Sequence, residues 1–233
     1  MLENTDKKYF DFDKTEWIIT WYSEKWPKNV IISPKIDWVK VTEIWSYAFQ
    51  SNNLTSIKLP NSVIEIWANA FENNKLTNVK IPDSVTEIWD QAFFKNKLTN
   101  IEIPNSITKI WRTAFANNNL KSIKISNSVT EIKPGVFENN NLKSIKIPNS
   151  ITKIGHKAFC NNKLINVKIP NSVIEIWLSA FKDNKLISVN FPNSIEIIWI
   201  HTFTENNLIS INILSENELW ENIFNKNIKN FLI

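Results

Sequence analysis

The stretch Val41-Thr-Glu-Ile-Trp-Ser-Tyr-Ala-Phe-Gln-Ser-Asn-Asn-Leu-Thr-Ser-Ile-Lys-Leu-Pro-Asn-Ser62 decides the fold, because it recurs without a gap along most of the chain. Further copies begin every 22 residues, at Val63, Val85, Ile107, Val129, Ile151, Val173 and Ile195. A fixed short period is the signature of a repeat architecture in which each copy stacks on its neighbours. The sequence therefore predicts one solenoid of eight coils over residues 41–214.

The same apolar residues return at the same positions of every copy, which we number as slots 1 to 22. Slot 4 is always isoleucine, slot 9 always phenylalanine and slot 14 always leucine, and slots 1, 17 and 19 are nearly always valine, isoleucine or leucine. One coil cannot enclose these side chains, so neighbouring coils must stack to bury them. Burial of each is worth about 1.5–3 kcal/mol, and the pattern predicts one core running through the stack.

Local signals predict the path of each coil. Slots 14–20, Leu-x-x-Ile-x-Ile-Pro, indicate a short strand with slots 17 and 19 inward and slots 16 and 18 outward, ended by the proline. Slots 1–4 indicate a second extended segment, and slots 6–11, around Ala-Phe, a short helical turn. Slot 12 is asparagine in every copy. We interpret it as a structural ladder bonded to the backbone, with a ligand-binding ladder as the alternative.

Both ends of the solenoid are expected to carry caps, because an open terminal edge invites pairing with other chains. Residues 1–40 start with a polar tail and continue with short apolar runs, which predict two or three strands in a small β cap. After the repeats, Ser215-Glu-Asn-Glu218 has the pattern of a capping box, and apolar residues follow at helical spacing. Residues 215–233 are therefore expected to form a capping helix. A membrane-surface or partner-binding helix is the alternative.

Composition excludes several classes of protein. The net charge of +4 is mild and both signs are interspersed, so no specific nucleic-acid partner is expected. The single cysteine excludes an intrachain disulfide framework. No apolar run is long enough for a transmembrane helix, and the first residues lack the apolar core of a signal peptide. The localisation is therefore open, between the cytoplasm and a longer surface protein of which this is a fragment, and we expect a monomer.

The sequence shows no set of residues that would carry catalysis. Gly135 and Gly155 alone cannot build a phosphate-binding loop, and no Cys-x-x-Cys, His-Glu-x-x-His or Ser-His-Asp pattern occurs. Cys160 has no histidine at an identifiable partner position, and His156 and His201 are expected to be solvated. We therefore predict a protein that is not an enzyme and needs no cofactor or metal.

The outward strand slots carry the candidate binding face. Slot 16 is serine or asparagine in every copy, and slot 18 is lysine in five copies. Parallel strands lie about 4.8 Å apart, so these lysines should form a column that attracts an acidic protein segment or an anionic polysaccharide. The alternative is a solvated face, partly neutralised by the glutamates at slot 3. The candidate residues are Lys58, Lys80, Lys124, Lys146, Lys168, Ser122, Ser144 and Asn166.

One repeat also identifies a family. The stretch Leu76-Thr-Asn-Val-Lys-Ile-Pro-Asp-Ser-Val-Thr-Glu-Ile-Trp-Asp-Gln-Ala-Phe93 resembles the repeat of the BspA-like leucine-rich repeat family, Leu-x-x-Ile-x-Ile-Pro-x-Ser-Val-x-x-Ile-Gly-x-x-Ala-Phe. The resemblance covers residues 41–213. It implies a leucine-rich-repeat solenoid with a parallel β-sheet face, without catalytic residues, that binds proteins or glycans in adhesion at the surface of bacteria or some protists. A structural spacer in a larger surface protein is the alternative.

The chain departs from that family at slot 5. Where the family has glycine, six copies have tryptophan, and the other two have Lys133 and Gly155; the six are Trp45, Trp67, Trp89, Trp111, Trp177 and Trp199. No packing rule admits all three residue types at one buried site. The family's glycine implies a positive φ or a close backbone approach, which tryptophan adopts poorly.

We therefore predict that most or all of the tryptophans are glycine in the living protein, encoded by UGA codons that the host translates as glycine. The chain has 11 tryptophans and only 2 glycines, whereas glycine makes up about 7% of an average protein. Trp38 follows Asp37 where an Asp-Gly hairpin turn would fit, and Trp26 precedes Pro27 where a Gly-Pro turn would fit.

The codon for position 45 and peptide masses of the native protein test this prediction. We expect a UGA codon and the mass of glycine. A UGG codon, or a tryptophan mass, would contradict it. The indoles, which as written should form an exposed stripe along one edge, would then become the leading candidate site.

Overall fold

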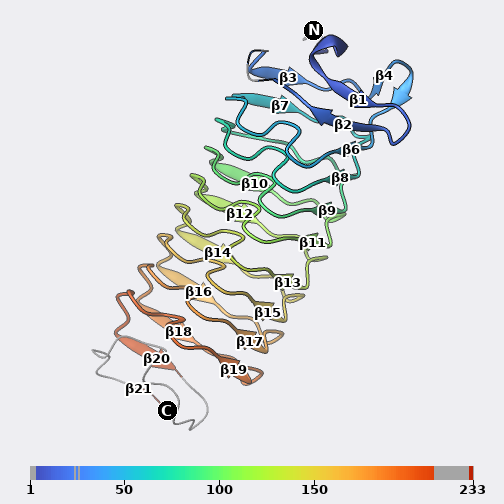
Figure 1. The fold of residues 1–233 in the computed structure, drawn as a ribbon. Helices are drawn as coiled ribbons and strands as arrows, with labels where there is room; N and C mark the ends of the chain where they lie inside the picture. The colour runs from blue at the N-terminus through green and yellow to red at the C-terminus, as the bar shows by residue number, and fades with distance from the viewer. Residues whose placement is uncertain (1–3, 24, 26, 213–230, 233) are drawn as a thin grey trace.

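Each coil follows the same path and lies on the coil before it (Figure 1). The computed structural model describes residues 4–23, 25, 27–212 and 231–232. Within this part of the chain the backbone forms an elongated solenoid of parallel coils, with the N-terminal strands at one end and strand β21 at the other (Figure 1). The predicted solenoid is therefore confirmed.

Slots 16–18 form the strands of one face, as the repeat pattern predicts. The strands are β7 (Ser56–Lys58), β10 (Asn100–Glu102), β12 (Ser122–Lys124), β14 (Ser144–Lys146), β16 (Asn166–Lys168), β18 (Ser188–Asn190) and β20 (Ser210–Asn212). Paired strands are parallel and keep the repeat in register, so that Lys146 lies beside Lys168. Residues 78–80 of coil 2 form no strand in this described segment, which interrupts the face.

Slots 3 and 4 form the strands of a second face. They are β6 (Glu43–Ile44), β8 (Glu65–Ile66), β9 (Glu87–Ile88), β11 (Lys109–Ile110), β13 (Glu131–Ile132), β15 (Lys153–Ile154), β17 (Glu175–Ile176) and β19 (Ile197–Ile198). These short strands pair in parallel in the orders β6-β8-β9-β11 and β13-β15-β17-β19. Slot 4 points into the core, and slot 3 is partly or fully exposed.

The expected helical turns at slots 6–11 are not present, and this prediction was wrong. The helical element of the described residues is η1 (Lys7–Tyr9), a short 3-10 helix that precedes the repeats. Slots 7 and 11 have positive φ in every coil, for example 65° at Tyr47 and 57° at Ser51, and such residues end a right-handed helix. Alternate N–H groups donate to the next coil instead, as from Phe49 N to Ala70 O at 2.8 Å.

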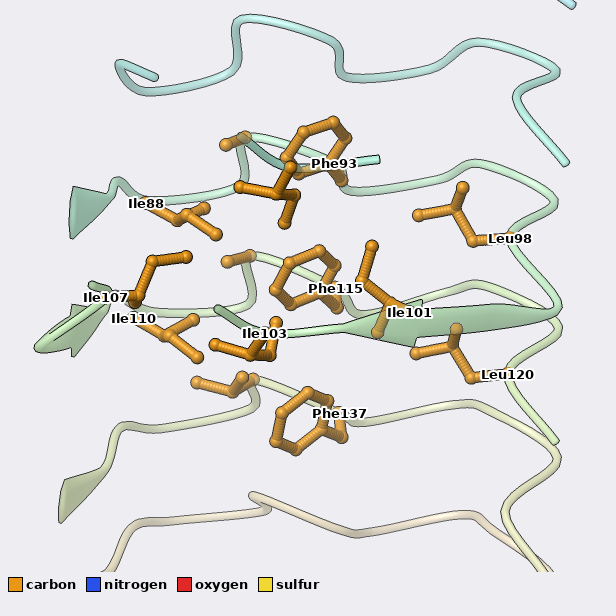
Figure 2. Close-up of a cluster of buried hydrophobic side chains, with 14 of the residues drawn as sticks. Ile88, Phe93, Leu98, Ile101, Ile103, Ile107, Ile110, Phe115, Leu120 and Phe137 are labelled. Atoms are coloured by element: carbon orange, nitrogen blue, oxygen red, sulfur yellow. The ribbon is translucent and has the colours of Figure 1, made fainter. Parts of the chain in front are cut away.

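The core is a set of columns that run through the stack (Figure 2). The slot-9 phenylalanines stack ring on ring, with centroids 5.4 Å apart for Phe93 and Phe115 and 6.1 Å for Phe115 and Phe137. Isoleucines of slot 4 and leucines of slot 14 flank them, and Leu120 is fully buried. The inward residues predicted from the repeat are therefore confirmed as one continuous core.

From coil 2 onward, the slot-12 asparagines tie each coil to the one before it, whereas Asn52 of coil 1 donates to Gln50 O of its own coil. The side-chain nitrogen of Asn118 donates to the carbonyl oxygens of Phe93, Phe115 and Ala116, at 2.9, 3.2 and 3.2 Å. Its side-chain oxygen accepts from Leu98 N at 3.0 Å. Because the backbone takes up both ends of this buried amide, the ladder holds the coils together and the structural interpretation stands.

The N-terminal cap contains more strands than the two or three expected. Strands β1 (Asp11–Asp13) and β2 (Ile18–Trp21) pair antiparallel, and β2 then adds to β6. Strand β3 (Asn29–Ile31) adds to β7 on the other face. Strands β4 (Lys35–Ile36) and β5 (Val39–Lys40) form a hairpin. The cap thus pairs with the edge of coil 1 on both faces, which removes the open edge.

At the C-terminal end, most of the expected helix at 215–233 lies outside the described residues. Its described part is strand β21 (Phe231–Leu232), which pairs in parallel with β20. A helix through these two residues is therefore not supported, and the structure shows a strand there.

Candidate binding face

Three candidate lysines come together on neighbouring strands. Lys124, Lys146 and Lys168 end β12, β14 and β16, and all three side chains are exposed. Ser122, Ser144 and Asn166 begin the same strands and are also exposed, while the residues between them point into the core. Strand alternation thus sets charged and small polar side chains side by side on the outer surface.

Two other candidates lie apart from this cluster. Lys58 ends β7 and Lys80 lies in the coil without a strand. Between them and Lys124 stands Glu102, whose carboxylate accepts from the Lys124 ammonium at 2.9 Å. Such an exposed pair contributes little stability, but it divides the column. A groove of about 720 Å³ lies here, bordered by Lys80, Glu102 and Lys124.

The column belongs to a larger basic surface that the sequence analysis missed. Slots 13–22, which we call the basic half of the coil, contain eleven lysines and, in coils 1–7, only two acidic residues, Asp83 and Glu102. The lysines are Lys58, Lys75, Lys80, Lys97, Lys121, Lys124, Lys143, Lys146, Lys163, Lys168 and Lys185. All eleven are exposed. A sum of charges by slot would have found the lysines of slots 13 and 15.

The basic half also lacks internal neutralisation. Within the described residues, Lys124 is the only one of its eleven lysines that forms an ion pair. Slots 1–12 behave differently: Lys109 pairs with Glu87 at 2.9 Å and Lys153 with Glu175 at 3.0 Å. The hydrogen bond that the Lys153 ammonium donates to Glu175 raises the pKa of Lys153. The charge of the basic half is therefore left available to a partner.

The slot-3 glutamates do not neutralise the column, contrary to the alternative considered from the sequence. They lie on the second face, and the described ones bond to groups there: the Trp67 indole donates to Glu43 at 2.7 Å. Burial raises the pKa of Glu65, and the carboxylates of Glu43 and Glu87 raise it further. No slot-3 glutamate pairs with a slot-18 lysine among the residues described.

The single cysteine and the two histidines differ in burial. Cys160 is buried, and burial raises the pKa of its thiol to about 11, which disfavours the nucleophilic thiolate. His156 is half-exposed, and its Nδ1 lies 2.8 Å from Leu178 O. The expected solvation of this side chain was therefore only partly right. His201 is exposed, as expected. The described residues contain no cluster of potential metal ligands, and no helix among them has the length and apolarity to cross a membrane.

The slot-5 tryptophans form the expected surface stripe. The rings lie against one another in coils 1–4 and again in coils 7 and 8, with centroids 4.8 Å apart for Trp67 and Trp89, but Lys133 and Gly155 interrupt the stripe. The exposed members are Trp45, Trp177 and Trp199, whereas Trp67, Trp89 and Trp111 are partly buried. The described slot-5 residues have no positive φ, so that part of the argument for glycine was wrong. The close approach is real at Gly155, where a Cβ would lie 2.8 Å from Ile132 O.

Positive φ does occur at tryptophans of the cap. Trp17 has a φ of 66° and Trp38 a φ of 68°, the latter in the two-residue turn of the β4–β5 hairpin with Asp37 at 49°. Turns of this kind favour glycine, and a bulky residue at such a φ is an outlier. Trp26 lies outside the described residues. The assignment of tryptophan positions to glycine stays a prediction, and the stripe stays outside the proposed site.

Comparison with known proteins agrees with this geometry. The sequence profile described as BspA type leucine rich repeat region matches residues 42–165 and 152–233, with six copies. The fold is similar to a leucine-rich repeat protein from Bacteroides ovatus, with a TM-score of 0.62 and 23% identity, over 84% of this chain and 58% of that one. It is also similar to one from Eubacterium ventriosum, with a TM-score of 0.55 and 18% identity, over 83% of this chain and 64% of that one. No curated protein matches.

This chain therefore spans less than two thirds of the length of these two solved proteins. At such identities the likeness concerns the fold alone.

Proposed function

Since the chain belongs to the BspA type leucine-rich repeat family, we propose that it is a non-enzymatic binding module whose basic half recognises another macromolecule at a cell surface. The observation that carries the proposal is the set of eleven exposed lysines, of which Lys124 alone forms an ion pair within the described residues. The placement at a cell surface rests on the family resemblance.

Rigidity supports this role. The ladder hydrogen bonds and the phenylalanine stack fix the distance between coils, so the backbone that carries the lysines is ordered before a partner arrives. Preorganisation lowers the entropic cost of binding. A one-signed surface also speeds the encounter with a partner of opposite charge.

The alternative is a structural spacer without a ligand. The continuous core and the Asn ladder favour it, because they make the solenoid stiff even if its surface binds no partner. A spacer predicts no saturable binding, and this separates the two functions.

We expect labelled protein to bind saturably to at least one of mucin, collagen, heparin and polygalacturonate on a printed panel. Changing Lys124, Lys146 and Lys168 together to glutamine should weaken that binding about tenfold or more, because three cations leave one surface. Binding should also weaken between about 0.1 and 1 M salt, where the screening length falls from about 10 to 3 Å.

The matched control changes Lys109, Lys153 and Lys182 to glutamine, which removes the same charge from slots 1–12. It should bind like the parent chain. Saturable binding to none of the probes would favour the spacer. An affinity that changes neither with salt nor in the first variant would show that the basic half is not the binding surface.

A further inference from the structure

Most outward side chains of the basic half are polar and repetitive, and the exceptions are three exposed isoleucines at slot 15, Ile165, Ile187 and Ile209. Slots 13, 15, 16 and 18 of coils 1–7 hold lysine, asparagine, serine, threonine, one glutamate and two isoleucines, without arginine or an aromatic residue. Protein interfaces are enriched in tyrosine, tryptophan and arginine and depleted in lysine and serine. Sites for single-stranded nucleic acid rely on aromatic stacking. The face lacks the anchors that both of these partners need.

The lysines are instead arranged in rows along the solenoid axis. Coils 4–6 carry six of them at slots 13, 15 and 18, and slots 13–22 of these coils contain no acidic residue. The register of β14 and β16 sets Lys146 beside Lys168. Hydrogen-bonded strands lie about 4.8 Å apart. Coil 2 has no strand and β12 does not pair with β14, so the five steps of the slot-18 column from Lys58 to Lys168 extend over at least about 24 Å. Cations at a fixed spacing along a line match a partner whose anions also repeat along a line.

Neutral polar groups lie next to this row. A groove of about 370 Å³ is bordered by Lys146, Asn127, Asn149 and Ser150. The larger groove beside Lys80 is lined by Asn78, Asn100 and Asn105, and also by Asp83 and Glu102. Amide and hydroxyl groups both donate and accept hydrogen bonds. They can therefore bond to the hydroxyl groups of a sugar chain whose anionic groups bind the lysines.

We propose that the partner of the basic half is a linear anionic polysaccharide, bound along the solenoid axis with its carboxylate or sulfate groups on the lysine rows. This inference rests on the proposed function and narrows its partner. Glu102 is the one acidic interruption of the slot-18 column, and it also neutralises Lys124.

Oligosaccharides of defined length test the inference by titration calorimetry on the full chain. The probes are heparin oligosaccharides for sulfate and oligogalacturonates for carboxylate, in lengths that bracket about 24 Å. We expect affinity for at least one series to rise with length and to level off once the column is covered. The series that binds identifies the anion. Neutral dextran oligosaccharides should not bind.

Two variants locate the site. The first variant changes three lysines of the basic half to glutamine, Lys124, Lys146 and Lys168, and its affinity should fall about tenfold or more. The control changes three lysines of slots 1–12 to glutamine, Lys109, Lys153 and Lys182, and its affinity should fall less than about twofold. Glu102→Lys should bind the longer oligosaccharides several-fold more tightly, because it completes the column and frees Lys124. A gain of affinity cannot come from misfolding.

Length-matched poly-glutamate and single-stranded DNA give the opposing outcomes. Tighter binding of either one than of both oligosaccharide series would overturn the polysaccharide inference and leave the proposed binding face standing. Equal losses of affinity in the two triple variants would overturn both the polysaccharide inference and the proposed binding face, because the site would then lie outside the basic half. Affinity that is independent of oligosaccharide length would also overturn alignment along the column.

Discussion

Replacing Phe115 with alanine should lower the free energy of unfolding by about 3–5 kcal/mol. Phe115 is fully buried and stacks between Phe93 and Phe137, with centroids 5.4 and 6.1 Å away. Its removal leaves a cavity that three coils share. The hydrogen-bond ladders on either side hold the coils at their spacing, so the cavity cannot close by collapse.

Phe203→Ala is the matched control for this variant. Phe203 occupies the same slot in the last coil and stacks on Phe181 at 5.3 Å, but the described part of the chain has no further coil of the repeat beyond it. Its loss should therefore cost less than that of Phe115. Guanidinium unfolding curves for both variants measure the difference. Equal losses would show that stability is not a sum of contacts between neighbouring coils.

Asn118→Ala should cost about 1–3 kcal/mol, the cost of one buried backbone group left without a partner. The change leaves Leu98 N without the acceptor that it has now. It also removes one of the two donors from each of the carbonyls of Phe93, Phe115 and Ala116, which keep their bonds from Asn96, Asn140 and Lys95 N. The same curves, with thermal melts, measure the loss.

Two further variants separate the hydrogen bonds from side-chain volume. Asn119→Ala removes the exposed neighbouring asparagine and should change stability by no more than about 0.5 kcal/mol. Asn118→Asp keeps the volume and the acceptor but loses the donor, and it sets a carboxylate against carbonyl oxygens. It should be at least as damaging as alanine at neutral pH. A loss below about 1 kcal/mol for both changes at Asn118 would refute a structural ladder.

The sequence by itself determined the repeat and its interior. Slots 4, 9 and 14 repeat the same apolar residue in all eight copies, and eight matching signals leave a single register that buries them. The strand at slots 16–18 followed from alternation within one coil, which is a local property. The lysine column followed from that strand and the period together. The position of the hairpin at Asp37 and Trp38 was likewise local.

Tertiary structure decided where the hydrogen bonds and the charges find their partners. The Ala-Phe segment was expected to turn as a helix, but Phe49 N bonds to Ala70 O in the next coil, and no local pattern contains that acceptor. Partial neutralisation of the lysines by the slot-3 glutamates was the alternative considered from the sequence, but these glutamates lie on the other face and bond there. Periodicity gives the direction in which each side chain leaves its coil, whereas neutralisation depends on which coils and faces meet. A sum of charges by slot finds the lysines of the basic half in the sequence, but only the stacked coils show which of them have acidic partners.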